Sequence, residues 1–99
     1  FGLLGLRNGK WKDKQLIEES WLKNSVTPTA ANTGYGYMNY FLNTDNKLLP
    51  SAPASSYVHI GNGTNMVYVD KEHDLVVVAR WIENNAMDQF IKLVLEARK

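Results

Sequence analysis

Cysteine is absent from this chain of 99 residues, and its absence excludes disulfides, thiolate zinc sites and cysteine nucleophiles together. The sequence also lacks a run of about 18 apolar residues that would span a bilayer. It lacks the charged, apolar and small-residue order of a signal peptide as well. It therefore predicts no membrane insertion, and it leaves the cellular compartment open.

A large charge of one sign is also lacking, because the chain has 11 Lys and Arg residues and 10 Asp and Glu residues, for a formal net charge of +1. The charges are scattered, so nothing favours a nucleic acid or an anionic membrane surface as a partner. With 44% hydrophobic and 21% charged residues, the composition is that of one globular domain. A chain this short buries only about 60 to 65% of its unfolded surface, so we expect modest stability unless a partner contributes.

The first residues, FGLLGL, are apolar and have the pattern of the end of a helix, and the chain begins with Phe1 rather than Met. We interpret the chain as a piece of a longer protein. Asn8 and Gly9 follow as a strong turn signal. The segment 16–24 (LIEESWLKN) then has the apolar spacing of a helix, which would end before Pro28.

The remainder of the chain has the pattern of strands followed by a helix. We expect a strand over 35–44, a β-ribbon over 57–69 and a strand over 75–81. Asn85 followed by Asp88 indicates the start of the helix. Its apolar stripe would consist of Met87, Phe90, Ile91 and Val94. The fold class is therefore α+β, with a three-stranded antiparallel sheet and flanking N- and C-terminal helices.

The strand that begins at Leu75 is notably apolar. Leu75 to Val78 are four apolar residues in a row, and Ala79 follows them. Such a run indicates a strand that is covered on both faces and lies inside a sheet.

The stretch SSYVHIGNGTNMVYVD, residues 55–70, places glycines inside the β-ribbon. Glycine in a strand costs conformational entropy, so Gly61 and Gly63 indicate a bulge, a turn or a ligand that lies against the backbone. In a purely local interpretation the glycines form a bulge or bend, and His59 is a half-exposed strand residue. In a functional interpretation the same strand lines a cleft.

Four motifs follow one another from His59 onward. They are His59-Ile60-Gly61, Asn62-Gly63, Val69-Asp70-Lys71-Glu72 and Asp74-Leu75-Val76-Val77-Val78. Their order and spacing resemble the C-terminal part of the serine β-lactamase and penicillin-binding-protein superfamily, especially its class C-like esterase and peptidase branch. The upstream segments NGKWKDKQLIEESWLKNSVTP and GYGYMNYF resemble the turn, helix and strand that precede these motifs in that family.

The resemblance implies an acyl-enzyme mechanism in which His59 and Asn62 are the catalytic residues. Fixed N–H donors aimed at the developing oxyanion stabilise such reactions most, and the backbone N–H of Asn62 would be one of them. His59 would stand where the family has lysine and would hydrogen-bond the nucleophile network or a substrate carboxylate, with a charge that depends on pH near neutrality. The implied substrate-binding residues are His59, Ile60, Gly61, Asn62 and Gly63, and no metal or cofactor is implied.

In that family a Ser-x-x-Lys motif supplies the nucleophile and a Tyr-x-Asn motif a proton-transfer group. We expect both motifs upstream, so residues 1–99 would be the C-terminal part of such a domain, without the nucleophile-bearing part. The whole protein would be a serine hydrolase with a small-molecule or peptide acyl substrate: an ester, a β-lactam or a D-amino-acid peptide. The alternative is a catalytically silent relative that serves as a binding or regulatory module. The resemblance to this family also implies a periplasmic or extracellular location in a bacterium.

The resemblance also implies a partner for the last strand, because the family sheet has five strands. The edge of strand 75–81 would pair either with the remaining N-terminal part of the same protein or with a second copy in a homo-oligomer.

Other residue patterns have simpler interpretations. His73 lies in an acidic turn, and a solvated turn is favoured over a metal site because no second cluster of ligands is present. The aromatic residues Tyr35, Tyr37, Tyr40 and Phe41 indicate core and cross-strand packing rather than a stacking surface for a sugar or base. Trp11, Trp21 and Trp81 are expected in the core.

Overall fold

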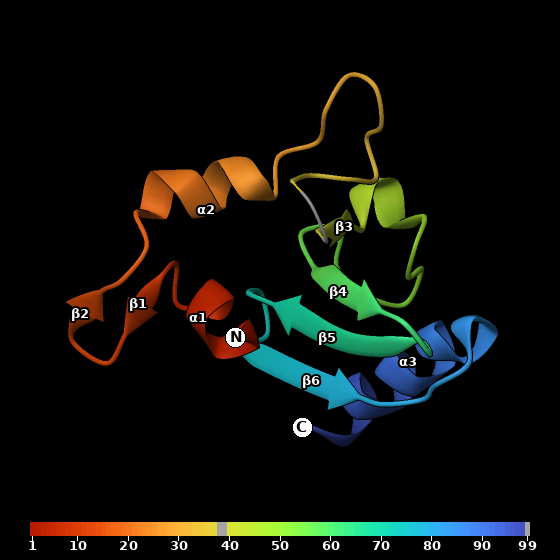
Figure 1. The fold of residues 1–99 in the computed structure, drawn as a ribbon. Helices are drawn as coiled ribbons and strands as arrows, with labels where there is room; N and C mark the ends of the chain where they lie inside the picture. The colour runs from red at the N-terminus through yellow and green to blue at the C-terminus, as the bar shows by residue number, and fades with distance from the viewer. Residues whose placement is uncertain (38–39, 99) are drawn as a thin grey trace.

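The computed structural model describes residues 1–37 and 40–98 and arranges them as an α+β fold with a sheet between helices (Figure 1). The elements, in chain order, are α1 (Gly2–Leu6), β1 (Lys10–Trp11), β2 (Lys14–Gln15), α2 (Glu19–Ser25), β3 (Phe41–Leu42), η1 (Thr44–Asn46), β4 (Tyr57–Gly61), β5 (Asn65–Asp70), β6 (Leu75–Ala79), η2 (Asn84–Ala86) and α3 (Met87–Ala97). The N- and C-terminal helices are thus confirmed.

The larger sheet has four antiparallel strands within the described residues, in the order β3-β4-β5-β6. Successive side chains of a strand point to opposite faces. Tyr68 of β5 therefore packs against Ile91 of α3 on one face, while its neighbour Val69 packs with Leu6 of α1 on the other. The sheet is covered by α3 on one side and by α1 on the other.

The prediction of three strands is wrong because the glycine-rich stretch divides the ribbon. Gly63 and Thr64 have φ angles of 78° and 56°, in the left-handed region that reverses a chain. Two strands, β4 and β5, result, with Gly61 paired to Asn65 across the turn. Of the three explanations considered for the glycines, a bulge, a turn and a bound ligand, the turn is confirmed for Gly63, whereas Gly61 ends β4.

The first predicted strand is much shorter than 35–44. Its strand part is β3, Phe41–Leu42, which pairs with Val58 and Tyr57 of β4, and a single bridge joins Tyr35 to Phe41. Residues 38 and 39 of that predicted strand lie outside the described residues. The predicted aromatic packing is confirmed for Tyr40, which is buried, whereas Tyr37 is exposed.

The hairpin of β1 and β2, which follows the Asn8-Gly9 turn, was not predicted. Because of it, α2 begins later in the chain than predicted. Gly9 has a φ of 85°, and a Cβ there would lie 2.2 Å from the carbonyl oxygen of Ile17, so this position requires glycine. The Gly9 carbonyl accepts hydrogen bonds from the N–H groups of Leu16 and Ile17. Leu16 and Ile17 therefore belong to the turn that closes the hairpin, and α2 begins at Glu19 instead of Leu16.

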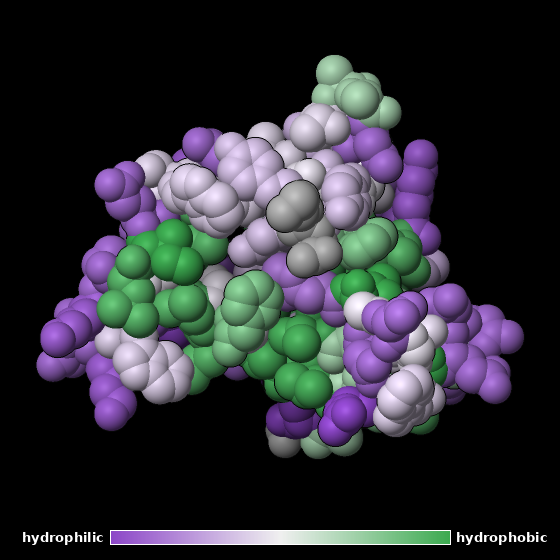
Figure 2. Space-filling model, viewed as in Figure 1, coloured by the Kyte–Doolittle hydropathy of each residue, from purple (hydrophilic) through white to green (hydrophobic). Residues whose placement is uncertain are grey.

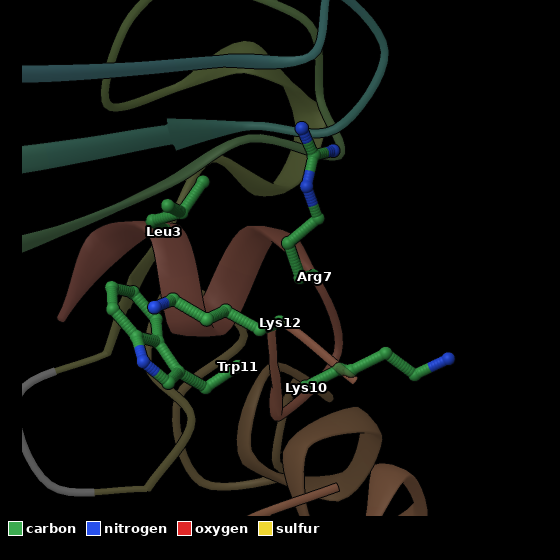
Figure 3. A pocket seen from close by; sticks show the side chains of 5 residues that line it. All are labelled: Leu3, Arg7, Lys10, Trp11 and Lys12. Carbon is green, nitrogen blue, oxygen red and sulfur yellow. The ribbon is translucent and has the colours of Figure 1, made fainter. Parts of the chain in front are cut away.

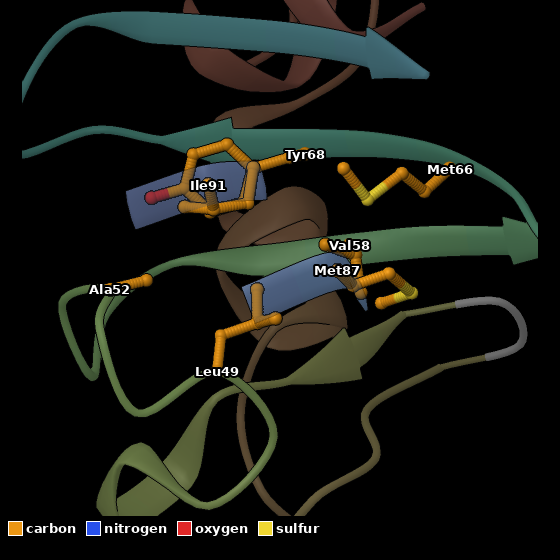
Figure 4. Packing of buried hydrophobic residues seen from close by; sticks show 7 residues of the cluster. All are labelled: Leu49, Ala52, Val58, Met66, Tyr68, Met87 and Ile91. Carbon is orange, nitrogen blue, oxygen red and sulfur yellow. The ribbon is translucent and has the colours of Figure 1, made fainter. Parts of the chain in front are cut away.

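The main core lies between the sheet and α3, where Figure 4 shows side chains of β4, β5 and the preceding loop directed at the helix. Its buried members are Leu49, Ala52, Val58, Met66, Tyr68, Met87 and Ile91. Phe90 and Val94 are half-buried on the same helix. The predicted apolar stripe of α3 is therefore confirmed.

The start of α3 differs from the prediction. The N-cap residue is Ala86, which follows the short helix η2, and Asn85 does not cap α3. The Asp88 carboxylate instead accepts hydrogen bonds from the N–H and the hydroxyl of Ser51, each at 2.8 Å. Asp88 thus attaches the loop before β4 to the first turn of α3.

The loop that leads into β4 is organised by the buried side chain of Asn43. Its amide nitrogen donates hydrogen bonds to the carbonyl oxygens of Leu49, Ala52 and Pro53, and its amide oxygen accepts one from the N–H of Leu49. These bonds satisfy backbone groups that would otherwise be buried without partners.

All three tryptophans are exposed, so their assignment to the core is wrong. Trp11 and Trp21 are 47% and 50% exposed, and Trp81 is 71% exposed. Trp11 lies on the two-residue strand β1, and Trp21 lies on α2, where its ring packs edge to face against that of the exposed Tyr37. The core is instead formed by aliphatic side chains, by methionines and by the tyrosines Tyr40, Tyr57 and Tyr68.

Strand β6 is an edge strand in the part of the chain that the structure describes, paired only with β5. Leu75, Val76 and Val77 are half-buried, but Val78 is 64% exposed. The prediction of a strand covered on both faces along its length is therefore wrong for Val78. Figure 2 shows hydrophobic residues gathered over α1 and the neighbouring part of the sheet.

Candidate functional site

The predicted site residues occupy the end of β4 and the turn that follows it. His59, Ile60 and Gly61 are the last three residues of β4, and Asn62 and Gly63 begin the turn to β5. The strand alternation sends the side chain of Ile60 into the main core, away from His59. Any contact of Ile60 with a ligand on the His59 face would therefore be through its backbone.

The His59 ring is half-buried and surrounded by aromatic rings. Its centroid lies 4.5 Å from that of Tyr40, 4.7 Å from that of Phe1 and 5.7 Å from that of Tyr57, all in edge-to-face arrangements. Such ring pairs orient a side chain, since edge-to-face geometry is preferred over a face-to-face stack. The imidazole is thus held in place by rings from three separate segments of the chain.

The phenols beside His59 are electrically neutral at physiological pH. Burial raises the pKa of Tyr57, and the neighbouring Tyr40 raises it further. Burial also raises the pKa of Tyr40, against a smaller opposing effect of its hydrogen bond with Ser25. The surroundings of the imidazole therefore contain no phenolate charge, and the rings act by packing and orientation.

Gly61 and Asn62 form an open backbone surface. A Cβ at Gly61 would meet no atom within 4 Å, so another chain or a ligand has room to approach the backbone there. The carbonyl oxygen of Asn62 accepts a hydrogen bond of 2.6 Å from the side-chain amide of Asn65. The turn is thereby held by a side chain of the following strand.

A serine–lysine pattern in α2 was missed by the sequence interpretation. Ser20-Trp21-Leu22-Lys23 matches Ser-x-x-Lys, and Tyr37-Met38-Asn39 matches Tyr-x-Asn, although Met38 and Asn39 lie outside the described residues. Ser20 and Lys23 are both exposed on a helix of seven residues. A nucleophile is normally held against its base in a protected site, so the pattern in α2 lacks the surroundings that the chemistry requires.

His73 makes a more specific contact than the solvated turn that was predicted. Its ring Nδ1 lies 2.7 Å from the carboxylate of Asp70, and its backbone N–H donates to the same carboxylate at 3.0 Å. The Asp70 carboxylate also accepts a 2.7 Å hydrogen bond from the Tyr68 hydroxyl. Among the described residues no group of three or more His, Cys, Asp or Glu side chains is placed to hold a metal ion.

A pocket of about 350 Å³ lies apart from these residues, lined by Leu3, Arg7, Lys10, Trp11 and Lys12 (Figure 3). Arg7 is paired with Asp74. Figure 3 shows the Lys12 side chain along the indole of Trp11, while Lys10 points away from it. The three cations do not converge on one point, so this pocket has no evident ligand.

A scan against models of known protein families finds no model that matches the chain. A search of curated proteins finds no significant match either. No helix within residues 1–37 and 40–98 is both long and apolar enough to cross a bilayer.

Proposed function

We propose that the chain is the C-terminal part of a serine hydrolase of the β-lactamase and penicillin-binding-protein type. It contributes the His59-Ile60-Gly61 strand and the backbone N–H of Asn62 to an acyl-transfer site. The observation that carries this proposal is the open backbone at Gly61 beside an imidazole fixed by three rings. An extended acyl substrate can lie along such a strand end, as peptides do in β-augmentation.

The chemistry assigns a separate role to each residue. A serine from another part of the protein attacks the carbonyl carbon, and the carbonyl oxygen gains negative charge as the tetrahedral intermediate forms. The N–H of Asn62 donates a hydrogen bond to that oxygen. His59 hydrogen-bonds the nucleophile network or a substrate carboxylate. The substrate is an ester, a β-lactam or a D-amino-acid peptide, and the site is periplasmic or extracellular in a bacterium.

The chain of 99 residues is expected to be inactive by itself, because the nucleophile is supplied by another part of the protein. Purified chain should hydrolyse neither nitrocefin nor p-nitrophenyl acetate above the buffer rate. A fluorophosphonate probe should label a serine of the longer protein but none of this chain.

The Ser20→Ala variant is the control for this experiment. Turnover by the chain that this variant abolishes would show that the exposed serine of α2 is the nucleophile, and the proposal would fail. A longer protein that takes no fluorophosphonate or penicillin label would favour the silent binding or regulatory module instead.

We also propose that the edge of β6 pairs with another chain. The strand carries no charge or proline over Leu75–Ala79, and charges or proline are the usual protection of a free edge. Antiparallel pairing of two copies about Val77 places Asp74 of each copy opposite Arg80 of the other, with opposite charges. In the longer protein the N-terminal part occupies the same edge.

Sedimentation of the chain at micromolar concentration should therefore show a dimer. Val78→Lys should shift it to monomer, because a charged side chain at the edge opposes pairing. Leu93→Lys on α3 is the matched control, since Leu93 is also exposed and lies off the edge. A monomer in the unmodified chain, with full amide protection along β6, would rule out this pairing.

A further inference from the structure

Trp81 is the feature that the packing of the fold leaves unexplained. Its side chain is 71% exposed, although tryptophan gains more than most residues from burial. Its φ is 58°, a left-handed conformation that is a true outlier for a bulky residue. Strain of this kind persists only where surrounding contacts impose it, and it occurs often at ligand sites.

Two hydrogen bonds to the β4–β5 turn impose this conformation. The N–H of Trp81 donates to the side-chain oxygen of Asn65 at 3.0 Å, and the N–H of Ile82 donates to the carbonyl oxygen of Thr64 at 3.2 Å. The other end of the Asn65 amide donates to the carbonyl oxygen of Asn62. One asparagine side chain thus connects the backbone of Trp81 directly with that of Asn62.

The indole itself lies on Gly63. A Cβ at Gly63 would be 2.1 Å from Cζ3 and 2.6 Å from Cε3 of Trp81, so the benzo ring sits where any other residue would place its side chain. Glycine is needed here both for its φ of 78° and for this contact. The contact with Gly63 therefore positions the ring, and most of the ring surface remains open to solvent.

We propose that the indole of Trp81 is an aromatic subsite beside Asn62, which binds a planar apolar group next to the substrate carbonyl. This inference rests on the proposed acyl-transfer function and adds the substrate class: acyl groups that carry an aromatic ring. An exposed indole on a fixed backbone offers a flat apolar face at little entropic cost. The backbone N–H of Asn62 donates a hydrogen bond to the carbonyl oxygen of the same ligand.

Phenylacetamide is the minimal probe, because it joins a ring to an amide carbonyl, and acetamide is its control without the ring. In ¹⁵N-labelled chain we expect phenylacetamide to shift the Trp81 indole N–H and the Asn62 and Gly63 amides together. Half-saturation should lie on the order of 10 mM, as expected for a ligand of this size. The indoles of Trp11 and Trp21, which are also exposed, serve as internal controls and should stay in place.

Trp81→Phe should weaken this binding by about threefold, and Trp81→Ala should abolish saturable shifts at Asn62. Trp21→Ala should leave the binding unchanged. Equal shifts of all three indoles, a shift of Trp81 without Asn62, or equal binding of acetamide would each overturn the inference. Because binding is read without chemistry, it is separable from the fluorophosphonate labelling: labelling without these shifts refutes the subsite alone, and shifts without labelling refute the hydrolase alone.

Discussion

Replacing Asp70 with alanine is expected to lower the free energy of unfolding by about 3 to 5 kcal/mol, the usual cost of leaving charged-group partners buried and unpaired. The Asp70 side chain is completely buried at the end of β5. It accepts hydrogen bonds from the Tyr68 hydroxyl and the His73 backbone, and it pairs with the His73 ring. Burial and the nearby carboxylate both raise the pKa of Tyr68, so its hydroxyl stays protonated and remains a donor.

Urea unfolding at pH 7, followed by circular dichroism, measures this effect. A small domain has a total stability of roughly 5 to 15 kcal/mol, so Asp70→Ala is expected to remove a large part of it. Asp74→Asn is the matched control, because Asp74 has a left-handed φ of 54° that asparagine also adopts. Asp74 is an exposed carboxylate paired with Arg7, and the loss of its charge should cost about 0 to 1 kcal/mol. Equal midpoints for the two variants would show that the buried carboxylate does not hold the β5–β6 turn.

Replacing His59 with phenylalanine is expected to lower the rate of fluorophosphonate labelling of the longer protein by about 10² to 10⁴ fold, the usual contribution of a positioned acid or base. Phenylalanine keeps a ring against Phe1, Tyr40 and Tyr57 and removes both nitrogen atoms. The free energy of unfolding should therefore change by no more than about 1 kcal/mol. Labelling and urea unfolding of the same preparation separate chemistry from stability.

His59→Ala completes this comparison, because it removes the ring as well. Each ring pair contributes about 0.5 to 1.5 kcal/mol beyond the area that it buries. The alanine variant should therefore lose both labelling and stability, whereas the phenylalanine variant loses labelling alone. Labelling of the phenylalanine variant at the unmodified rate would mean that His59 takes no part in the nucleophile network.

Local sequence determined those parts of the fold that depend on neighbouring residues. The Asn8-Gly9 turn was predictable because few other residues accept a left-handed φ. The α3 stripe was predictable because its spacing repeats every turn of a helix. The start of α2 was not, because Leu16 and Ile17 are held in the turn after the hairpin by hydrogen bonds to the carbonyl of Gly9. Helical spacing gives no information on this contact with an earlier part of the chain.

The candidate site likewise has features that the sequence predicts and features that it does not. The sequence by itself placed His59, Gly61 and Asn62 together, since they lie within four successive positions, and it identified the glycines as exceptional. Strand alternation puts the side chains of His59 and Ile60 on opposite faces, but the sequence could not tell which face meets α3, because that depends on the whole sheet.

Only the tertiary structure decided the contacts between distant segments. The rings of Phe1 and Tyr40 reach His59 from other parts of the chain. The indole of Trp81 lies on Gly63 although the two are 18 positions apart (81 − 63). Composition predicts that a tryptophan is buried, but burial requires a second layer over it. The described fold places the Trp81 indole on a turn, and no layer covers it there.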